Sequence, residues 1–94
     1  MREKELEQKL IKEVRKRGGL CLKFVSPGFA GVPDRLLLMS RGRVAFVEVK
    51  RPGEVPRMLQ KSRHRLLRKL GFKVYVLDHE DQIERIIGEM EGGI

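Results

Sequence analysis

The chain has 94 residues and a formal net charge of +8, and it is 40% hydrophobic, 36% charged and 5% aromatic, with no Trp. This length predicts a single domain, residues 1–94, and the composition is typical of a soluble globular protein. No apolar run approaches the roughly 20 residues of a membrane span, and the N-terminus lacks the apolar segment of a signal peptide. The single cysteine, Cys21, excludes a disulfide framework and predicts a reducing, cytoplasmic location.

The positive charge is concentrated in the middle of the chain. Residues 41–73 contain eleven Lys or Arg residues against two acids, whereas residues 74–94 contain one Arg against six acids. This distribution predicts one positive face, as expected of a protein that binds nucleic acid. A generally basic, solvated surface is the alternative interpretation.

The N-terminal half is predicted to form one helix and three strands. A helix over residues 2–17 ends at a Gly-Gly pair, and a short apolar strand follows over 20–25. Two further apolar runs, 36–39 and 44–49, are separated by a Gly-containing turn, which indicates a β-hairpin. The predicted inward stripe of the helix consists of Leu6, Leu10, Ile11 and Val14.

The C-terminal half is predicted to continue with a helix over 57–70, a strand over 72–77 and a helix over 80–90, for which Asp78 is the predicted N-cap. The resulting order, α-β-β-β-α-β-α, indicates an α/β fold with a mixed sheet flanked by helices. The crossover helix favours a parallel pairing of the last strand. The predicted inward residues of these two helices are Met58, Leu59, Leu66, Leu67 and Leu70, and then Ile83, Ile86, Ile87 and Met90.

Three charged residues stand at the ends of the hairpin strands. Asp34 precedes the first strand, and Glu48 and Lys50 lie near the end of the second. Because these two ends lie side by side in an antiparallel hairpin, the three side chains are expected to converge, with Glu48 and Lys50 on one face. The continuous apolar runs beside them are typical of strands covered on both faces, so the charges would stand at the edge of a buried sheet.

A charge at such a place costs several kcal/mol unless it is paired or binds a metal. Two carboxylates plus a backbone carbonyl form the oxygen environment that Mg²⁺ prefers, with water completing the coordination. A neighbouring lysine can stabilise charge that develops on a phosphate, so the combination suits hydrolysis of a phosphodiester. The structural alternative is a turn-capping Asp34 and a solvated Glu48–Lys50 pair.

The hairpin residues also resemble a known nuclease signature. Pro33-Asp34, followed fourteen residues later by Glu48-Val49-Lys50, matches the PD-(D/E)XK pattern of restriction-endonuclease-like nucleases. The wider context resembles the virus-type replication-repair nuclease (VRR-NUC) domain. The shared features are a Glu-bearing first helix that ends in Gly-Gly, the segments KFVSPGFAGVPDR and VAFVEVKRPG, and a Gln, Gln60, in the next helix.

This resemblance implies a restriction-endonuclease-like core and Mg²⁺- or Mn²⁺-dependent cleavage of branched DNA. Standalone phage or bacterial members are associated with homodimers that act on four-way junctions, whereas the domain in eukaryotic repair nucleases acts on flaps. The resemblance therefore implies a DNA endonuclease in a bacterial or phage-infected cell, with DNA, a second copy, and a helicase or replication protein as partners.

The resemblance also implies the roles of individual residues. Asp34, Glu48 and the backbone carbonyl of Val49 would be metal ligands, Lys50 the catalytic lysine, and Gln60 a further residue of the site. An acid of the first helix would join the metal, directly or through water. Glu3 and Glu7 are four residues apart on the apolar side of that helix, and both are candidates.

Several basic and polar residues are candidates for contacting DNA. Lys23 lies within a predicted strand, and Ser26 lies in the Gly-rich loop that leads to Asp34. His64, in the basic helix, is a minor candidate for a general base. The functional alternatives are a non-catalytic DNA-binding module and a sequence-specific restriction enzyme. The predicted DNA-contacting residues are Lys23, Ser26, Arg51, Arg57, Lys61 and Arg65.

Overall fold

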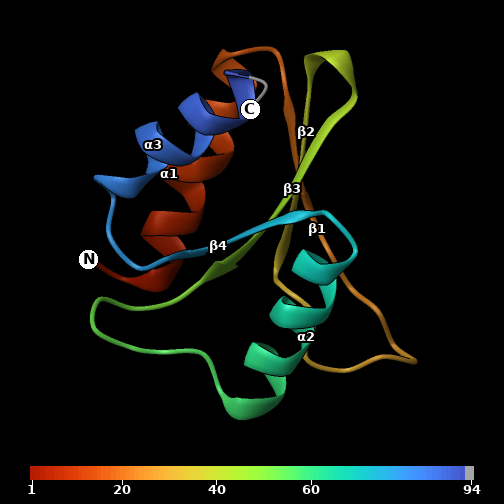
Figure 1. Cartoon of the computed structure of the whole chain (residues 1–94). Coiled ribbons are helices and arrows are strands. Elements are labelled where there is room, and N and C mark those ends of the chain that lie inside the picture. Colours follow the sequence, from red (N-terminus) through yellow and green to blue (C-terminus); the bar gives the residue numbers. More distant parts are fainter. Residues whose placement is uncertain (93–94) are drawn as a thin grey trace.

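The computed structural model describes residues 1–92 and contains, in that range, the predicted order α-β-β-β-α-β-α with a four-stranded mixed sheet (Figure 1). The predicted fold class is therefore confirmed. No helix in the described range is long and apolar enough to cross a membrane. The elements are α1 (Glu3–Lys16), β1 (Leu20–Lys23), β2 (Arg35–Met39), the short 3-10 helix η1 (Ser40–Gly42), β3 (Arg43–Val49), α2 (Met58–Lys69), β4 (Lys73–Leu77) and α3 (Gln82–Glu91).

The sheet has the strand order β1-β2-β3-β4. β1 pairs with β2 and β2 pairs with β3, both antiparallel, and β4 pairs with β3 in parallel. The hairpin turn at η1 is tight because Arg41 and Gly42 both adopt positive φ angles, 66° and 70°. The predicted hairpin and the predicted parallel pairing after the crossover helix are both confirmed.

The main core lies on one face of this sheet. Alternate residues of β3, among them Ala45, Val47 and Val49, point to that face and are fully buried. Figure 1 shows that α1 and α3 lie side by side over this face, whereas α2 lies on the other side of the sheet. The helices contribute the predicted apolar stripes to the core through Leu6, Leu10, Val14, Ile83, Ile86, Ile87 and Met90.

The opposite face is covered by α2 and by aromatic rings. Phe46 of β3 contacts Phe24 and Phe72, with ring centroids 5.4 and 5.6 Å apart. Two residues further along β3, Glu48 lies on this same face and is only 1% exposed. The face that α2 covers therefore combines an apolar half with a buried carboxylate.

The predicted inward side of α2 is largely wrong. Met58, Leu59, Leu66 and Leu70 are 85%, 47%, 41% and 66% exposed, and only Leu67 is half-buried among the five predicted residues. The buried residues of α2 are Gln60 and His64. The helix turns a polar stripe toward the sheet because its neighbour there is Glu48 rather than an apolar layer.

The predicted N-cap of the last helix is also wrong. α3 begins at Gln82, after a turn in which the Gln82 N–H donates to the His79 carbonyl. Asp78 instead pairs with the side chain of Gln82, whose amide nitrogen donates to Asp78 Oδ1 over 2.8 Å. Asp78 thus stabilises the turn that precedes α3, from a position about one helical turn before the helix begins.

Candidate active site

The hairpin brings the two acids of the PD…EVK pattern together. β2 and β3 pair Arg35 with Val47 and Leu36 with Phe46, and one further step in this register places Asp34 opposite Glu48. The Val49 N–H donates to Asp34 Oδ2 over 2.9 Å, which fixes the Asp34 side chain against the end of β3. The expected convergence at the strand ends is therefore present in the structure.

Glu48 is surrounded by polar groups from β3 and α2. Gln60 Nε2 donates to Glu48 Oε2 over 3.1 Å, and Lys50 Nζ lies 3.9 Å from the same oxygen. His64 Nε2 lies 3.6 Å from the other oxygen, Oε1. The four predicted catalytic side chains thus form one cluster: Asp34, Glu48, Lys50 and Gln60.

The electrostatics of this cluster favour a neutral Glu48 carboxyl. Burial, followed by the hydrogen bond and negative charge of Asp34, raises the pKa of Glu48 to about 8. The positive charge of Lys50 opposes this shift, and the negative charge of Glu3 adds to it. A cation bound between Asp34 and Glu48 would favour the ionised form of the Glu48 carboxyl. The two carboxyls therefore form a place where a cation would relieve the repulsion between them.

Gln60 owes its position to the start of α2. Its side-chain oxygen accepts a hydrogen bond from the Arg57 N–H over 2.9 Å, while its amide nitrogen donates to Glu48. One side chain therefore satisfies a free backbone donor at the helix start and holds the site acid.

His64 was only a minor candidate in the sequence, but the structure places it beside Glu48. Burial, and then the positive charge of Arg68, lower its pKa, while Asp34 acts in the opposite direction. Its spacing of four residues from Gln60 was the available signal, since residues i and i+4 share one side of a helix. This spacing predicts that His64 faces the sheet only if Gln60 is already known to face it.

The two candidate acids of α1 have different surroundings. Glu7 Oε2 accepts a hydrogen bond from Arg35 Nε over 2.9 Å, and Arg35 lies on the sheet face that α1 covers, opposite to that of Glu48. Glu3 is exposed at the start of α1, and its charge reaches Glu48. Of the two acids, Glu3 is therefore the one whose charge acts on the carboxyl cluster.

The predicted DNA-contacting residues lie in several places. Lys23 is exposed and pairs with Arg35, so it lies on the face opposite to Glu48. The Ser26 carbonyl accepts a hydrogen bond from the Phe29 N–H, and Arg51 forms an exposed ion pair with Glu54. The remaining three, Arg57, Lys61 and Arg65, are exposed at the start and along the outer side of α2.

Arg63 is a structural residue that the sequence pattern did not single out. Its Nε donates to the Ala30 carbonyl over 2.7 Å, and its guanidinium lies 3.7 Å from the centroid of the Phe29 ring. Gly31 approaches α2 so closely that an added Cβ would lie 2.8 Å from Leu59 Cγ. These contacts fasten the loop before Asp34 onto α2 and so help to position that acid.

The carboxyl pair has the features of a site for a divalent cation. Glu48 Oε1 is buried and has no hydrogen-bond partner within residues 1–92, so an acceptor is available for a cation. The described residues contain no group of three or more His, Cys, Asp or Glu side chains that could hold a metal. Mg²⁺ commonly binds through one or two carboxylates and retains several waters, so the two acids with a backbone carbonyl suit it.

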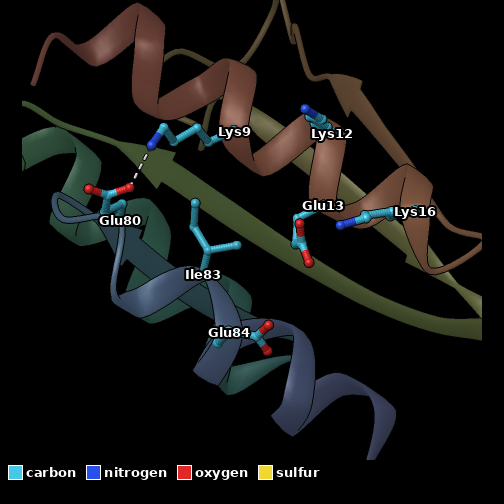
Figure 2. Close-up of a pocket in the computed structure, with 7 residues that line it drawn as sticks. All are labelled: Lys9, Lys12, Glu13, Lys16, Glu80, Ile83 and Glu84. Carbon is cyan, nitrogen blue, oxygen red and sulfur yellow. Dashed lines mark hydrogen bonds and ion pairs between the residues drawn. The ribbon is translucent and has the colours of Figure 1, made fainter.

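A hollow lies between α1 and α3, on the face of the sheet opposite to Glu48 (Figure 2). Figure 2 shows basic and acidic side chains interleaved around it, and Lys9 Nζ binds Glu80 Oε2 over 2.6 Å. Because its charges neutralise one another, this hollow has no evident preference for an anion or a cation. It is lined by Lys9, Lys12, Glu13, Lys16, Glu80, Ile83 and Glu84.

Comparisons with known proteins give matches in both sequence and structure. The protein named "Putative nuclease p44" of Acyrthosiphon pisum secondary endosymbiont phage 1 is 51% identical over 81 residues, which cover 86% of this chain and 87% of that protein. A solved structure described as "VRR_NUC domain" matches with a TM-score of 0.86 and 31% identity, over 92% of this chain and 94% of that chain. No protein-family model matches the chain. On the strength of the relative and the shared fold, the chain belongs to the VRR-NUC family of nucleases.

Proposed function

We propose that this chain is a Mg²⁺- or Mn²⁺-dependent endodeoxyribonuclease that selects branched DNA, four-way junctions and flaps, by structure rather than sequence. The observation that carries the proposal is the buried Glu48, opposite Asp34 and in contact with Gln60 beside Lys50. The name of the phage relative, a nuclease, supports the reaction class. Residues 1–94 would act as one nuclease domain.

The proposed cation would be held by Asp34, Glu48 and the Val49 carbonyl, with an acid of α1, Glu3 or Glu7, directly or through water. When bound, it would supply Lewis-acid polarisation of a phosphate oxygen and acidify water for attack. The unpartnered Oε1 of Glu48 and the shared environment of the two carboxyls support this assignment. Gln60 would keep Glu48 in one orientation throughout.

Lys50 would stabilise charge on the reacting phosphate. Its side chain is 12% exposed, so its ammonium group is partly shielded from water beside Glu48. An ammonium group acts more strongly on a developing negative charge in such a place than it does in bulk water. Lys50 would have a second task as well, because its positive charge favours the ionised form of Glu48.

The side of α2 next to β4 offers a surface for the DNA backbone. A hollow of about 290 Å³ lies between α2 and β4, next to His64. Three of its lining residues, Lys61, Arg65 and Arg68, are cationic, and α2 contains no acid. Phosphate groups bound there would lie close to the carboxyl cluster, because His64 reaches both the hollow and Glu48.

The double variant Lys61→Ala/Arg65→Ala is expected to weaken DNA binding at every sequence alike. Each lost phosphate contact should reduce the slope of log K against log salt by about 1, so we expect a reduction of about 2. Fluorescence anisotropy of labelled junction DNA over a salt series, in Ca²⁺ to prevent cleavage, measures this slope. Lys12→Ala/Lys16→Ala on α1 is the matched control, and an equal reduction there would contradict the placement.

We further propose that two copies associate through the apolar half of the α2 side of the sheet. β1 is an edge strand, and its Leu20 and Leu22 are 51% and 42% exposed on that side. Leu22→Glu is expected to convert a dimer into a monomer in sedimentation equilibrium. Val55→Glu, at an exposed loop position, is the control and should leave the dimer intact.

The proposed function is tested with fluorescent junction, flap and linear duplex DNA in Mg²⁺, Mn²⁺ or EDTA. The expected result is cleavage of the branched substrates in either metal, little cleavage of the duplex, and none in EDTA. Equal cleavage of all three substrates would reject structure selection. Cleavage that persists in EDTA would reject the metal mechanism, and DNA binding without cleavage in either metal would favour a non-catalytic binding module.

A further inference from the structure

The side of α2 that faces the sheet has an uncommon composition. Its buried residues are Gln60 and His64, 8% and 2% exposed, one helical turn apart, while three of its four Met and Leu side chains are exposed. Burying two polar side chains in place of available leucines is unfavourable unless both find partners. Both point to the same carboxyl group, that of Glu48.

The two oxygens of the Glu48 carboxyl have different partners in the structure. Glu48 Oε2 accepts a hydrogen bond from Gln60 and lies 3.9 Å from Lys50 Nζ. Glu48 Oε1 and His64 Nε2, 3.6 Å apart, are both buried without a hydrogen-bond partner among the described residues. Two unsatisfied polar atoms that face each other need a shift of only a few tenths of an ångström to form a hydrogen bond.

We propose that His64 is a positioning residue, whose Nε2–H donates to Glu48 Oε1 while Gln60 donates to Oε2. α2 would then hold both oxygens of the acid and fix the plane of the carboxylate. Each oxygen retains a second lone pair, so the acid can still bind a cation. The inference rests on the proposed function only in that it assigns Glu48 the role of cation ligand.

The geometry separates this role from general-base catalysis. His64 is 2% exposed and its Nε2 is buried 3.6 Å from Glu48 Oε1, so this nitrogen is directed at the acid and not at the hollow that the ring also borders. Residues that orient a metal ligand typically change metal affinity or activity by roughly 10–100-fold when they are replaced. The proposed role therefore depends on the Nε2–H donor of His64, and not on the shape of the ring or on its charge.

Two substitutions at His64 test the donor. His64→Gln places an amide nitrogen near the position of Nε2, whereas His64→Leu fills similar space without a donor. In steady-state cleavage with saturating Mn²⁺, we expect His64→Leu to lower kcat roughly 10–100-fold with KM for DNA unchanged. His64→Gln should retain most of kcat, and His79→Leu, at the exposed second histidine, should retain all of it.

A second measurement does not depend on activity. In ¹⁵N NMR of the metal-free protein at a pH above the pKa of Glu48, where Oε1 can only accept, the His64 ring should carry a proton at Nε2, and Glu48→Gln should shift that nitrogen signal. A proton at Nδ1 alone, wild-type kcat in His64→Leu, or equal loss in folded His64→Gln and His64→Leu would overturn the proposal. If the wild-type protein cleaves no DNA, the proposed function fails, and the NMR result still decides whether His64 donates to Glu48.

Discussion

Replacing Glu48 by Gln is expected to lower the rate of metal-dependent DNA cleavage by about 10³-fold. The substitution preserves shape and the contact with Gln60 but removes the negative charge that would hold the cation opposite Asp34. Losing the charge stabilisation supplied by a metal amounts to several kcal/mol, and about 4 kcal/mol corresponds to 10³-fold in rate. Single-turnover cleavage of junction DNA in Mg²⁺ measures the loss.

The same variant should fold at least as well as the parent. Glu48 is 1% exposed, and an amide is neutral at every pH, whereas the carboxyl must be protonated to avoid a buried charge beside Asp34. An inactive Glu48→Gln protein with an unchanged or raised melting temperature would therefore separate lost chemistry from lost structure. Glu54→Gln, an acid of the following loop that pairs with Arg51, is the matched control. Retention of more than a tenth of the parental rate by Glu48→Gln would contradict the role of this acid.

The hairpin and its two acids could be predicted from sequence because the relevant rules are local. A strand places alternate residues on one face, and a short turn fixes which residues lie opposite. These two rules are enough to place Asp34 against Glu48, as the observed register does. The stripes of α1 and α3 were equally accessible, since both helices cover the larger apolar face.

The orientation of α2 was not accessible in this way. Helical periodicity locates an inward side by its apolar residues, and in α2 these residues, such as Met58 and Leu66, are exposed. The true inward stripe is polar because it faces Glu48. The buried polar cluster at Glu48 thus reverses the usual pattern, and Gln60 indicated the reversal only through the resemblance to VRR-NUC domains.

The partner of Glu7 was also outside the reach of sequence patterns. Angular spacing placed both Glu3 and Glu7 within the apolar stripe of α1, which predicts a partner for each without identifying it. The partner of Glu7 is Arg35, 28 residues later, and it becomes visible only when α1 packs on the sheet. The metal contact of Glu3 or Glu7 stays a prediction, although the Arg35 contact gives Glu7 a structural role of its own.

In the absence of divalent metal, the free energy of unfolding is expected to fall as pH rises from about 4.5 to about 8. Glu48 has an ordinary pKa of 4.5 when unfolded and about 8 when folded, so the folded state binds more protons in this window. Stability therefore decreases with rising pH, by an amount of the order of a few kcal/mol in total. Urea unfolding in EDTA at pH 5, 6, 7 and 8 measures this dependence.

Glu48→Gln isolates the contribution of this one group. The lowered pKa of His64 acts in the opposite direction as pH rises toward its ordinary value of 6.5, but this histidine is common to both proteins and cancels in the difference. The parent should lose stability relative to Glu48→Gln between pH 5 and 8. Mn²⁺ should restore it most at pH 8, because a cation stabilises the ionised pair of Asp34 and Glu48. A pH-independent difference in EDTA would mean that Glu48 is paired well enough to ionise without metal, and the site would then be structural rather than prepared for a cation.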